Sequence, residues 1–159
     1  MLAIGIGMAA AAAAFAQVPV GEPLAPLDES AAQDRCLPEG HSMDTPVDSI
    51  PPAQRRRVLA CLTAEAARQL NARTPIQVQE GVTMTRVTAE GLTMTYEHRL
   101  DVDASVFDAN GRAAIEAAVR GNVCGSAQMV QAMGNGAAFA YAFADRAGIP
   151  VHRFLIDRC

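Results

Sequence analysis

The sequence predicts an α+β domain in which helices lie mainly on one face of a four-stranded antiparallel sheet, with disulfides stabilising the fold. Apolar residues recur at helical spacing after Pro52, whereas residues 82–102 and 136–159 alternate as strands do, each around a turn. A second glycine-interrupted helical segment lies between the two strand regions. The order helix, hairpin, helix, hairpin is typical of the α+β class.

The N-terminal region predicts export. The first 16 residues form an apolar run ending in Ala14-Phe15-Ala16, a small-residue pattern typical of signal-peptide cleavage. We therefore predict a signal peptide at 1–16, a proline-rich arm tethered by Cys36 at 17–51 and a single α+β domain at 52–159. The residue directly after the cleavage site is Gln17 rather than a cysteine, so no stable membrane anchor is predicted once the leader is removed. The predicted location is periplasmic or secreted.

The first predicted helix begins at Pro52, a residue that the first helical turn tolerates. Its apolar stripe recurs every three or four residues and comprises Val58, Leu59, Leu62, Ala66 and Leu70. Asn71 to Pro75 ends this helix.

The first predicted hairpin has two strands separated by Ala89-Glu90-Gly91. In its second strand one face carries Leu92, Met94, Tyr96, His98 and Leu100, while the other carries Thr93, Thr95, Glu97 and Arg99. We expect the first of these faces to be buried.

The region after Gly111 predicts either two short helices or one kinked helix, with Cys124 at the joint. Gly121 and Gly125 interrupt its apolar stripe, and glycine weakens a helix interior by about 1 kcal/mol relative to alanine. In the closing hairpin the aromatic residues Phe139, Tyr141 and Phe143 alternate with alanines, which predicts one aromatic face and one face of small side chains.

Cys36, Cys61, Cys124 and Cys159 are four cysteines in a chain predicted to be exported. Three pairings are possible. We favour Cys36 with Cys61 and Cys124 with Cys159, because each pair joins neighbouring segments.

The C-terminal half also resembles a known class of protein. Asn71 and Pro75 precede a threonine-rich hairpin that ends near Tyr96, and a spaced set of residues follows: Cys124, Gly134, Tyr141, Asp145, Gly148 and Cys159. The pattern Cys, Tyr-x-x-x-Asp-x-x-Gly, Cys resembles small exported bacterial domains of unknown function. The resemblance implies an exported α+β domain and supplies no catalytic residue.

The composition and motifs do not indicate an enzyme or a nucleic-acid-binding protein. The net charge is −4, and no phosphate loop, dinucleotide fingerprint or zinc-protease motif is present. Consequently no catalytic residue, metal site or cofactor is predicted. The candidate surface or ligand residues are Tyr96, His98, Tyr141 and His152. The two tyrosines, together with the methionine and phenylalanine residues of the same region, also suit a core.

We therefore predict an exported binding or protein-interaction module of the bacterial envelope, which contacts a protein partner through a sheet edge or through the threonine-bearing face. One alternative is a small hydrolase or metal-dependent enzyme that uses His98 and His152, provided that their strands are neighbours. Another alternative is a self-associating structural protein, for which a homodimer is expected.

Overall fold

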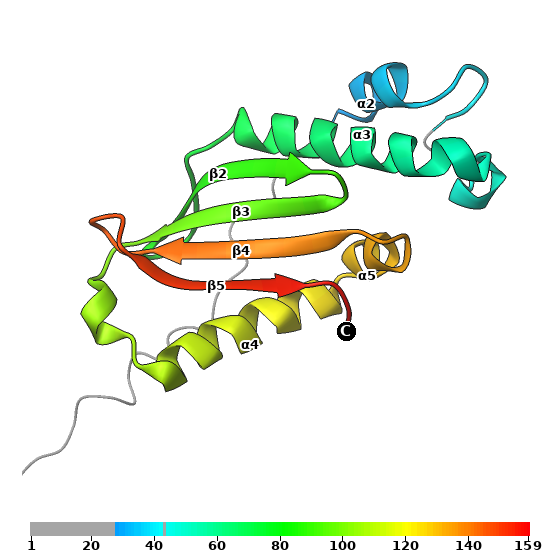
Figure 1. Ribbon diagram of the computed structural model, residues 1–159. Coiled ribbons are helices and arrows are strands. Elements are labelled where there is room, and N and C mark those ends of the chain that lie inside the picture. Colours follow the sequence, from blue (N-terminus) through cyan, green and yellow to red (C-terminus); the bar gives the residue numbers. More distant parts are fainter. Residues whose placement is uncertain (1–27, 43) are drawn as a thin grey trace, which may run out of the picture.

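The structure is a computed structural model that describes residues 28–42 and 44–159. One sheet contains five strands in the order β1-β2-β3-β4-β5 (Figure 1). The strands are β1 (Ile76–Gln79), β2 (Val82–Glu90), β3 (Thr93–Leu100), β4 (Ala138–Ala144) and β5 (Pro150–Ile156). The helices are α2 (Glu29–Cys36), α3 (Pro52–Asn71), α4 (Ala109–Gly125) and α5 (Ala127–Gly134), with short 3₁₀ turns η1 (Val47–Ser49) and η2 (Ala104–Val106). The predicted signal peptide lies outside the described residues.

The predicted α+β class is confirmed, but the sheet has five strands rather than four and is mixed rather than antiparallel. The additional strand is β1, which pairs antiparallel with β2. The two predicted hairpins join through a parallel β3–β4 pairing. The connection between them passes through α4 and α5, and a helical crossover of this kind returns the chain to the end of the sheet where β3 began.

Helix α3 extends over the predicted region and packs mainly on β2. Val58 and Ala67 on this helix are buried. At the helix end the side-chain oxygen of Asn71 accepts a hydrogen bond from the backbone N–H of Val87 on β2, at 3.0 Å. The C-terminal end of α3 is therefore fixed to the sheet beside Val87.

The second helical region forms two helices, one of the two arrangements expected from its glycines. Asp108 caps the start of α4 by accepting a hydrogen bond from the Gly111 backbone N–H at 2.8 Å. The break comes at Ser126, two residues beyond Cys124, and the Ser126 side chain caps α5. Its hydroxyl satisfies a backbone N–H that the new helix leaves without an intrahelical partner.

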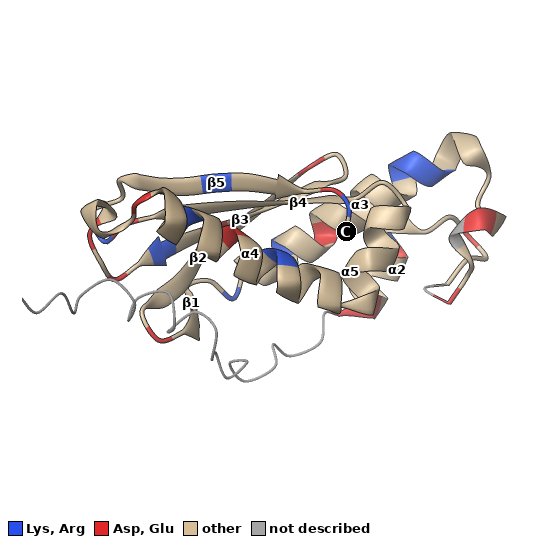
Figure 2. Cartoon of the chain, turned by 90° about the horizontal axis from the view of Figure 1, so that it is seen from below, with Lys and Arg blue, Asp and Glu red and all other residues tan. Residues whose placement is uncertain are grey.

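The four helices of the described residues lie on one side of the sheet, as Figure 2 shows for the view along its edge. The core forms between this side of the sheet and the helices, and it includes Met94, Leu100, Ile115, Val123, Phe139 and Ile156. We call this side the helical face and the opposite side the open face. The predicted one-sided arrangement of helices is thus confirmed.

The arm contains a helix that the sequence analysis did not predict, α2. Asp28 caps its start, since its side chain accepts a hydrogen bond from the Ala31 backbone N–H at 3.1 Å. The short segment has no apolar stripe, so periodicity gives no signal for it. Its stability comes from contacts with α3.

Two disulfides are present, Cys36–Cys61 and Cys124–Cys159, with Cα–Cα separations of 5.4 and 5.7 Å. This is the pairing that the sequence analysis favours. The first joins α2 to α3, and the second joins α4 to the last residue of the chain.

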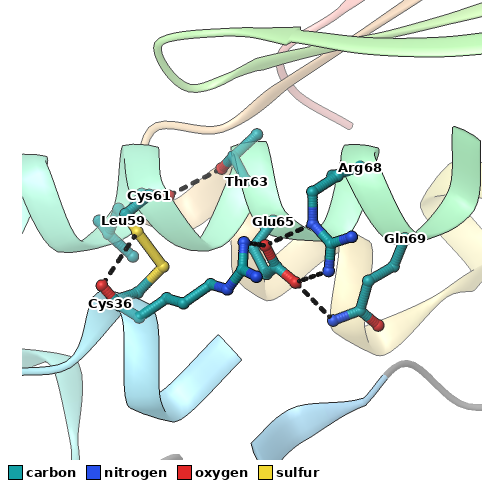
Figure 3. The surroundings of a disulfide bond; sticks show 8 residues. Cys36, Leu59, Cys61, Thr63, Glu65, Arg68 and Gln69 are labelled. Atoms are coloured by element: carbon teal, nitrogen blue, oxygen red, sulfur yellow. Dashed lines mark hydrogen bonds and ion pairs between the residues drawn. A yellow bond between two sulfur atoms is a disulfide. The ribbon is translucent and has the colours of Figure 1, made fainter. Parts of the chain in front are cut away.

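A polar network accompanies the first disulfide (Figure 3). The buried carboxylate of Glu65 accepts hydrogen bonds from Arg68 Nε at 2.9 Å and from Gln69 Nε2 at 3.0 Å, and Arg35 on α2 lies 3.5 Å away. The hydrogen bonds from Arg68 and Gln69 lower the pKa of Glu65 to about 2. An ionised Glu65 thus ties α2 to α3 beside the disulfide.

We predict unequal effects from removing the two disulfides. Cys124 and Cys159 are 35 residues apart in the sequence. Replacing both by serine lowers the free energy of unfolding by about 4 kcal/mol on the chain-entropy estimate. Replacing Cys36 and Cys61 by serine lowers the free energy of unfolding by less. Without this disulfide α2 can detach from α3 in the native state, so the native state gains part of the conformational entropy that the unfolded state gains. Urea denaturation of both variants tests this difference, and equal losses would contradict it.

Candidate functional site

Strand register brings six rings together on the helical face of β3, β4 and β5. Tyr96, Tyr141 and Phe154 occupy one row across the three strands, and the next row follows the same pattern. The ring centroids of Tyr96 and Tyr141 lie 5.1 Å apart, and those of His98 and Phe143 lie 4.8 Å apart. We call the whole set the aromatic cluster: Tyr96, His98, Tyr141, Phe143, His152 and Phe154.

Burial keeps the central titratable groups of the aromatic cluster neutral. Burial raises the pKa of Tyr96 to about 12. It also raises the pKa of Tyr141, and the charge interaction with the nearby Tyr96 raises that pKa further. Burial lowers the pKa of His98 to about 4 because the imidazolium ion is poorly solvated there. These three side chains therefore offer uncharged hydrogen-bonding groups at neutral pH.

One buried polar atom of the aromatic cluster lacks a partner within the part of the chain that the structure describes. Nδ1 of His98 is buried and has no hydrogen bond. The hydroxyls of Tyr96 and Tyr141 make no hydrogen bond to a described residue either, but unlike Nδ1 of His98 they are not fully buried atoms. Since buried polar atoms in native proteins are almost always paired, Nδ1 of His98 is an exception within the aromatic cluster.

The structure brings Tyr96, His98 and Tyr141 together but sets His152 apart from them. β3 and β5 are not neighbours, since β4 lies between them, so Phe143 separates His98 from His152. Two strand spacings amount to about 10 Å, too far for a shared metal ion or proton. Instead His152 Nε2 lies 3.2 Å from Oε2 of Glu116 on α4.

The metal or hydrolase alternative required His98 and His152 to lie on neighbouring strands. This condition is not met. Residues 28–42 and 44–159 also contain no group of three histidine, cysteine or acidic side chains placed to hold a metal ion. His41, in the arm, lies close to the carbonyl oxygen of Glu39 at 3.4 Å.

The open face carries a second feature, a hollow of about 590 Å³ at one end of β3, β4 and β5. Its floor is the small side chain of Ala140, which lies between Thr95 on β3 and Leu155 on β5. The lining residues are Glu90, Thr93, Thr95, Ala140, Arg153, Phe154 and Leu155. The alanines of β4 create this depression because their neighbours on both strands are longer.

The β5 side of this hollow is exposed. Leu155 is 49% exposed, and Arg153 forms no ion pair with a residue of the described chain. The sequence analysis did not select either residue as a candidate. Alternation along the strand places both opposite the aromatic side chains, but it does not reveal that β5 is an edge strand.

The two edges of the sheet differ. β1 has four residues, and its pairing with β2 is irregular between Gln77 and Gln79. β5 has seven residues, and its register irregularity is confined to its beginning. Short and irregular edges resist the addition of a further strand, so β5 is the edge better suited to pairing.

Asp145, in the turn between β4 and β5, has a structural role. Its buried carboxylate accepts backbone hydrogen bonds from Ala104 at 3.0 Å and from Ala147 and Ile149 at 2.8 Å each. Burial opposes ionisation, but these backbone donors outweigh it and lower the pKa of Asp145. Gly148 adopts a φ of 84°, which glycine tolerates best. The Asp and Gly of the Tyr-x-x-x-Asp-x-x-Gly pattern therefore build this turn.

No protein-family model matches the chain, and no curated protein sequence matches it either. Solved structures do match. They include a protein of Pseudomonas aeruginosa described as secreted, at 20% identity and a TM-score of 0.55, covering 62% of this chain and 88% of that one. The pilotin EpsS of the Vibrio vulnificus type 2 secretion system matches at 14% identity and a TM-score of 0.56, covering 64% and 89%.

A third similar structure is the type II secretion system pilotin AspS of Vibrio cholerae, at 17% identity and a TM-score of 0.54, covering 65% of this chain and 93% of that one. At these identities the likeness establishes a shared fold. The two disulfides belong to an oxidising compartment, so the chain is an exported protein, periplasmic or secreted, as predicted. Within the described residues, none of the helices has the length and apolar character needed to cross a membrane.

We predict that His98 makes stability depend on pH. Its pKa is about 4 in the folded chain and 6.5 ordinarily, so between these values the unfolded chain binds more protons. The free energy of unfolding then falls as pH decreases from 6.5 to 4, by about 3 kcal/mol in total. His98→Phe removes this part of the pH dependence, as urea denaturation at several pH values would show.

His41→Gln is the matched control for this experiment, because it removes a histidine from the arm and leaves the aromatic cluster unchanged. It retains the slope of the unmodified protein. A slope that persists in His98→Phe would show that His98 is not the group responsible.

Proposed function

We propose that this protein is an interaction module that binds an extended segment of a partner protein along the β5 edge. The observation that carries the proposal is the one-sided arrangement of the helices, which leaves the longer edge strand and the neighbouring open face uncovered. A partner strand would gain backbone hydrogen bonds along β5, the mode of recognition known as strand addition.

Side chains at this edge favour a particular kind of segment. Arg153 is an exposed cation without an ion-pair partner in the described chain, and an acidic side chain opposite it would be favourable. Leu155 beside the hollow offers apolar contact to the next residue on the same face. The expected partner segment is therefore extended, with an acidic residue and an apolar residue two positions apart.

The same residues disfavour pairing of β5 with a second copy of itself. Arg153 is the central residue of the strand, so antiparallel pairing centred on it would place two arginines opposite one another. Like charges directly opposite are destabilising in a sheet. A different protein is thus a better partner for this edge than a homodimer.

The comparisons support an interaction role without identifying the partner. Two of the similar structures are described as pilotins of type II secretion systems. A fold used in such systems agrees with a role in contacting other envelope proteins.

A site-specific photo-crosslinking residue at position 155 tests the proposal in the native envelope. We expect a covalent adduct with a single partner protein, and we expect the adduct to be reduced at least several-fold by Arg153→Glu. The charge reversal replaces the attraction between Arg153 and an acidic partner segment by repulsion, which weakens binding at the β5 edge.

Arg158→Glu is the control, since it makes the same charge change at an exposed residue beyond the end of β5. It leaves the adduct intact. Adducts from a crosslinker at Gln77 on β1, with none from position 155, would overturn the proposal in favour of the other edge.

A further inference from the structure

The hollow on the open face is bordered by the same side chains of β5 that face the proposed partner segment. Arg153 and Leu155 line the hollow from β5, and its floor is Ala140 on β4. Ala140 is 6% exposed, so the floor is a methyl group lying below the longer side chains around it. A strand added to β5 would therefore lie directly beside the two residues that form this wall of the hollow.

No side chain stands between Arg153 and Leu155 on the open face. The residue between them in the sequence is Phe154, and its ring lies on the helical face. There it stacks on Tyr141, with the ring centroids 5.6 Å apart. The open face thus has a passage from the outer side of β5 to the floor of the hollow.

The width of this passage suits a flat side chain. Residues two positions apart on one strand are separated by about 6.8 Å. Since carbon atoms in contact lie about 3.5 Å apart, an aromatic ring standing in the passage contacts both neighbours without displacing them. A branched aliphatic side chain is thicker than a ring and would have to push the two apart.

The chemistry of the passage also favours an aromatic ring. Arg153 is exposed and forms no ion pair with a residue of the described chain. A planar guanidinium group stacks on the face of an aromatic ring, while the N–H groups at its rim remain free to bind a carboxylate. The acidic residue expected opposite Arg153 and a ring beside it can therefore be bound at the same time.

The wall of the hollow furthest from β5 is polar. Thr95 lies beside Ala140 on β3, and Thr93 and Glu90 complete this wall. Their side chains make no hydrogen bond to a described residue, and their oxygens can accept one. The best-fitting ring thus has an apolar body and one donor at its edge, as the indole of tryptophan has.

A tryptophan on an added strand reaches this site. The added strand would lie about 4.8 Å outside β5, and β4 lies about as far inside it, so the two strands are about 10 Å apart. Contact between the ring and the methyl group of Ala140 is made at about 3.5 Å, which leaves about 6.5 Å for the side chain to cover. An extended indole side chain has this length.

We propose that the partner segment carries a tryptophan opposite Leu155, two positions from its acidic residue, and that the indole ring passes between Arg153 and Leu155 into the hollow. This inference rests on the proposed function, because it specifies a side chain that the added strand presents at the β5 edge. Backbone pairing along β5 accepts many sequences, whereas the hollow selects for a flat side chain.

Two synthetic peptides with blocked termini test the proposal. The first, TEVWVET, has a glutamate two positions from its tryptophan on either side, so one glutamate meets Arg153 in either strand direction. The second, TEVLVET, has leucine in place of tryptophan. The protein contains no tryptophan, so indole fluorescence reports on the first peptide alone. We expect TEVWVET to bind about ten times more tightly than TEVLVET, measured by competition, and its emission to shift to shorter wavelength.

Ala140→Leu fills the floor of the hollow. We expect it to abolish both the emission shift and the preference for TEVWVET, while TEVLVET binds as before. Ala142→Leu is the matched control, since it introduces the same side chain on the same face of β4 but outside the lining of the hollow. It retains the preference. Urea denaturation of both variants shows whether they are folded.

Arg153→Lys provides a second test that leaves the core of the domain unchanged. Lysine keeps the positive charge but lacks the planar group that stacks on a ring. We expect the preference for TEVWVET over TEVLVET to fall several-fold in this variant. The affinity for TEVLVET changes little, because the attraction to glutamate is retained.

Equal dissociation constants for the two peptides, or an unshifted emission from bound TEVWVET, would overturn the inference and leave strand addition at β5 intact. A preference that persists in folded Ala140→Leu would also contradict it, since the ring would then lie elsewhere. Failure of both peptides to bind counts against the inference too. In that case the photo-crosslinked adduct at position 155 decides the proposed function separately.

Discussion

The parallel pairing of β3 with β4 is the contact on which the other features depend. It joins two hairpins that would each be marginal alone into one five-stranded sheet. It also aligns Tyr96 with Tyr141 and His98 with Phe143. The crossover that allows this pairing consists of α4 and α5. Both the break at Ser126 and the disulfide at Cys124 lie in this crossover.

This sheet order gives the two faces different chemistry. β4 has aromatic residues on one side and alanines on the other. Because β4 lies between β3 and β5, the aromatic residues and the alanines lie in the interior of the two sheet faces rather than at an edge. On the helical face the rings of β3, β4 and β5 stack on one another across the strands. On the open face the alanines leave a hollow bordered by exposed side chains of β5. Two surfaces of different chemistry thus arise from one alternating strand.

Local periodicity predicted the elements whose signal lies within the chain. The helix from Pro52 and both hairpins follow from residue spacing, whereas the glycines of the second helical region left two arrangements open. β1 is too short to give a periodic signal, and α2 is a helix without an apolar stripe, so its contacts with α3 decide its structure. The alternative use of His98 and His152 depended on strand order, which local periodicity does not contain. For the same reason the sequence placed Tyr96 and Tyr141 on buried faces without showing that their rings stack.

The covalent and polar links make the proposed edge rigid before any partner arrives. Cys159 follows β5 by three residues and is bonded to Cys124 on α4, while Asp145 fixes the turn at the other end of the strand. Glu116 on α4 adds a contact to His152 in the strand itself. An added strand therefore orders mainly its own backbone, because β5 is already held along its length. Since the entropy of ordering both chains opposes strand addition, a preformed edge lowers the cost of binding.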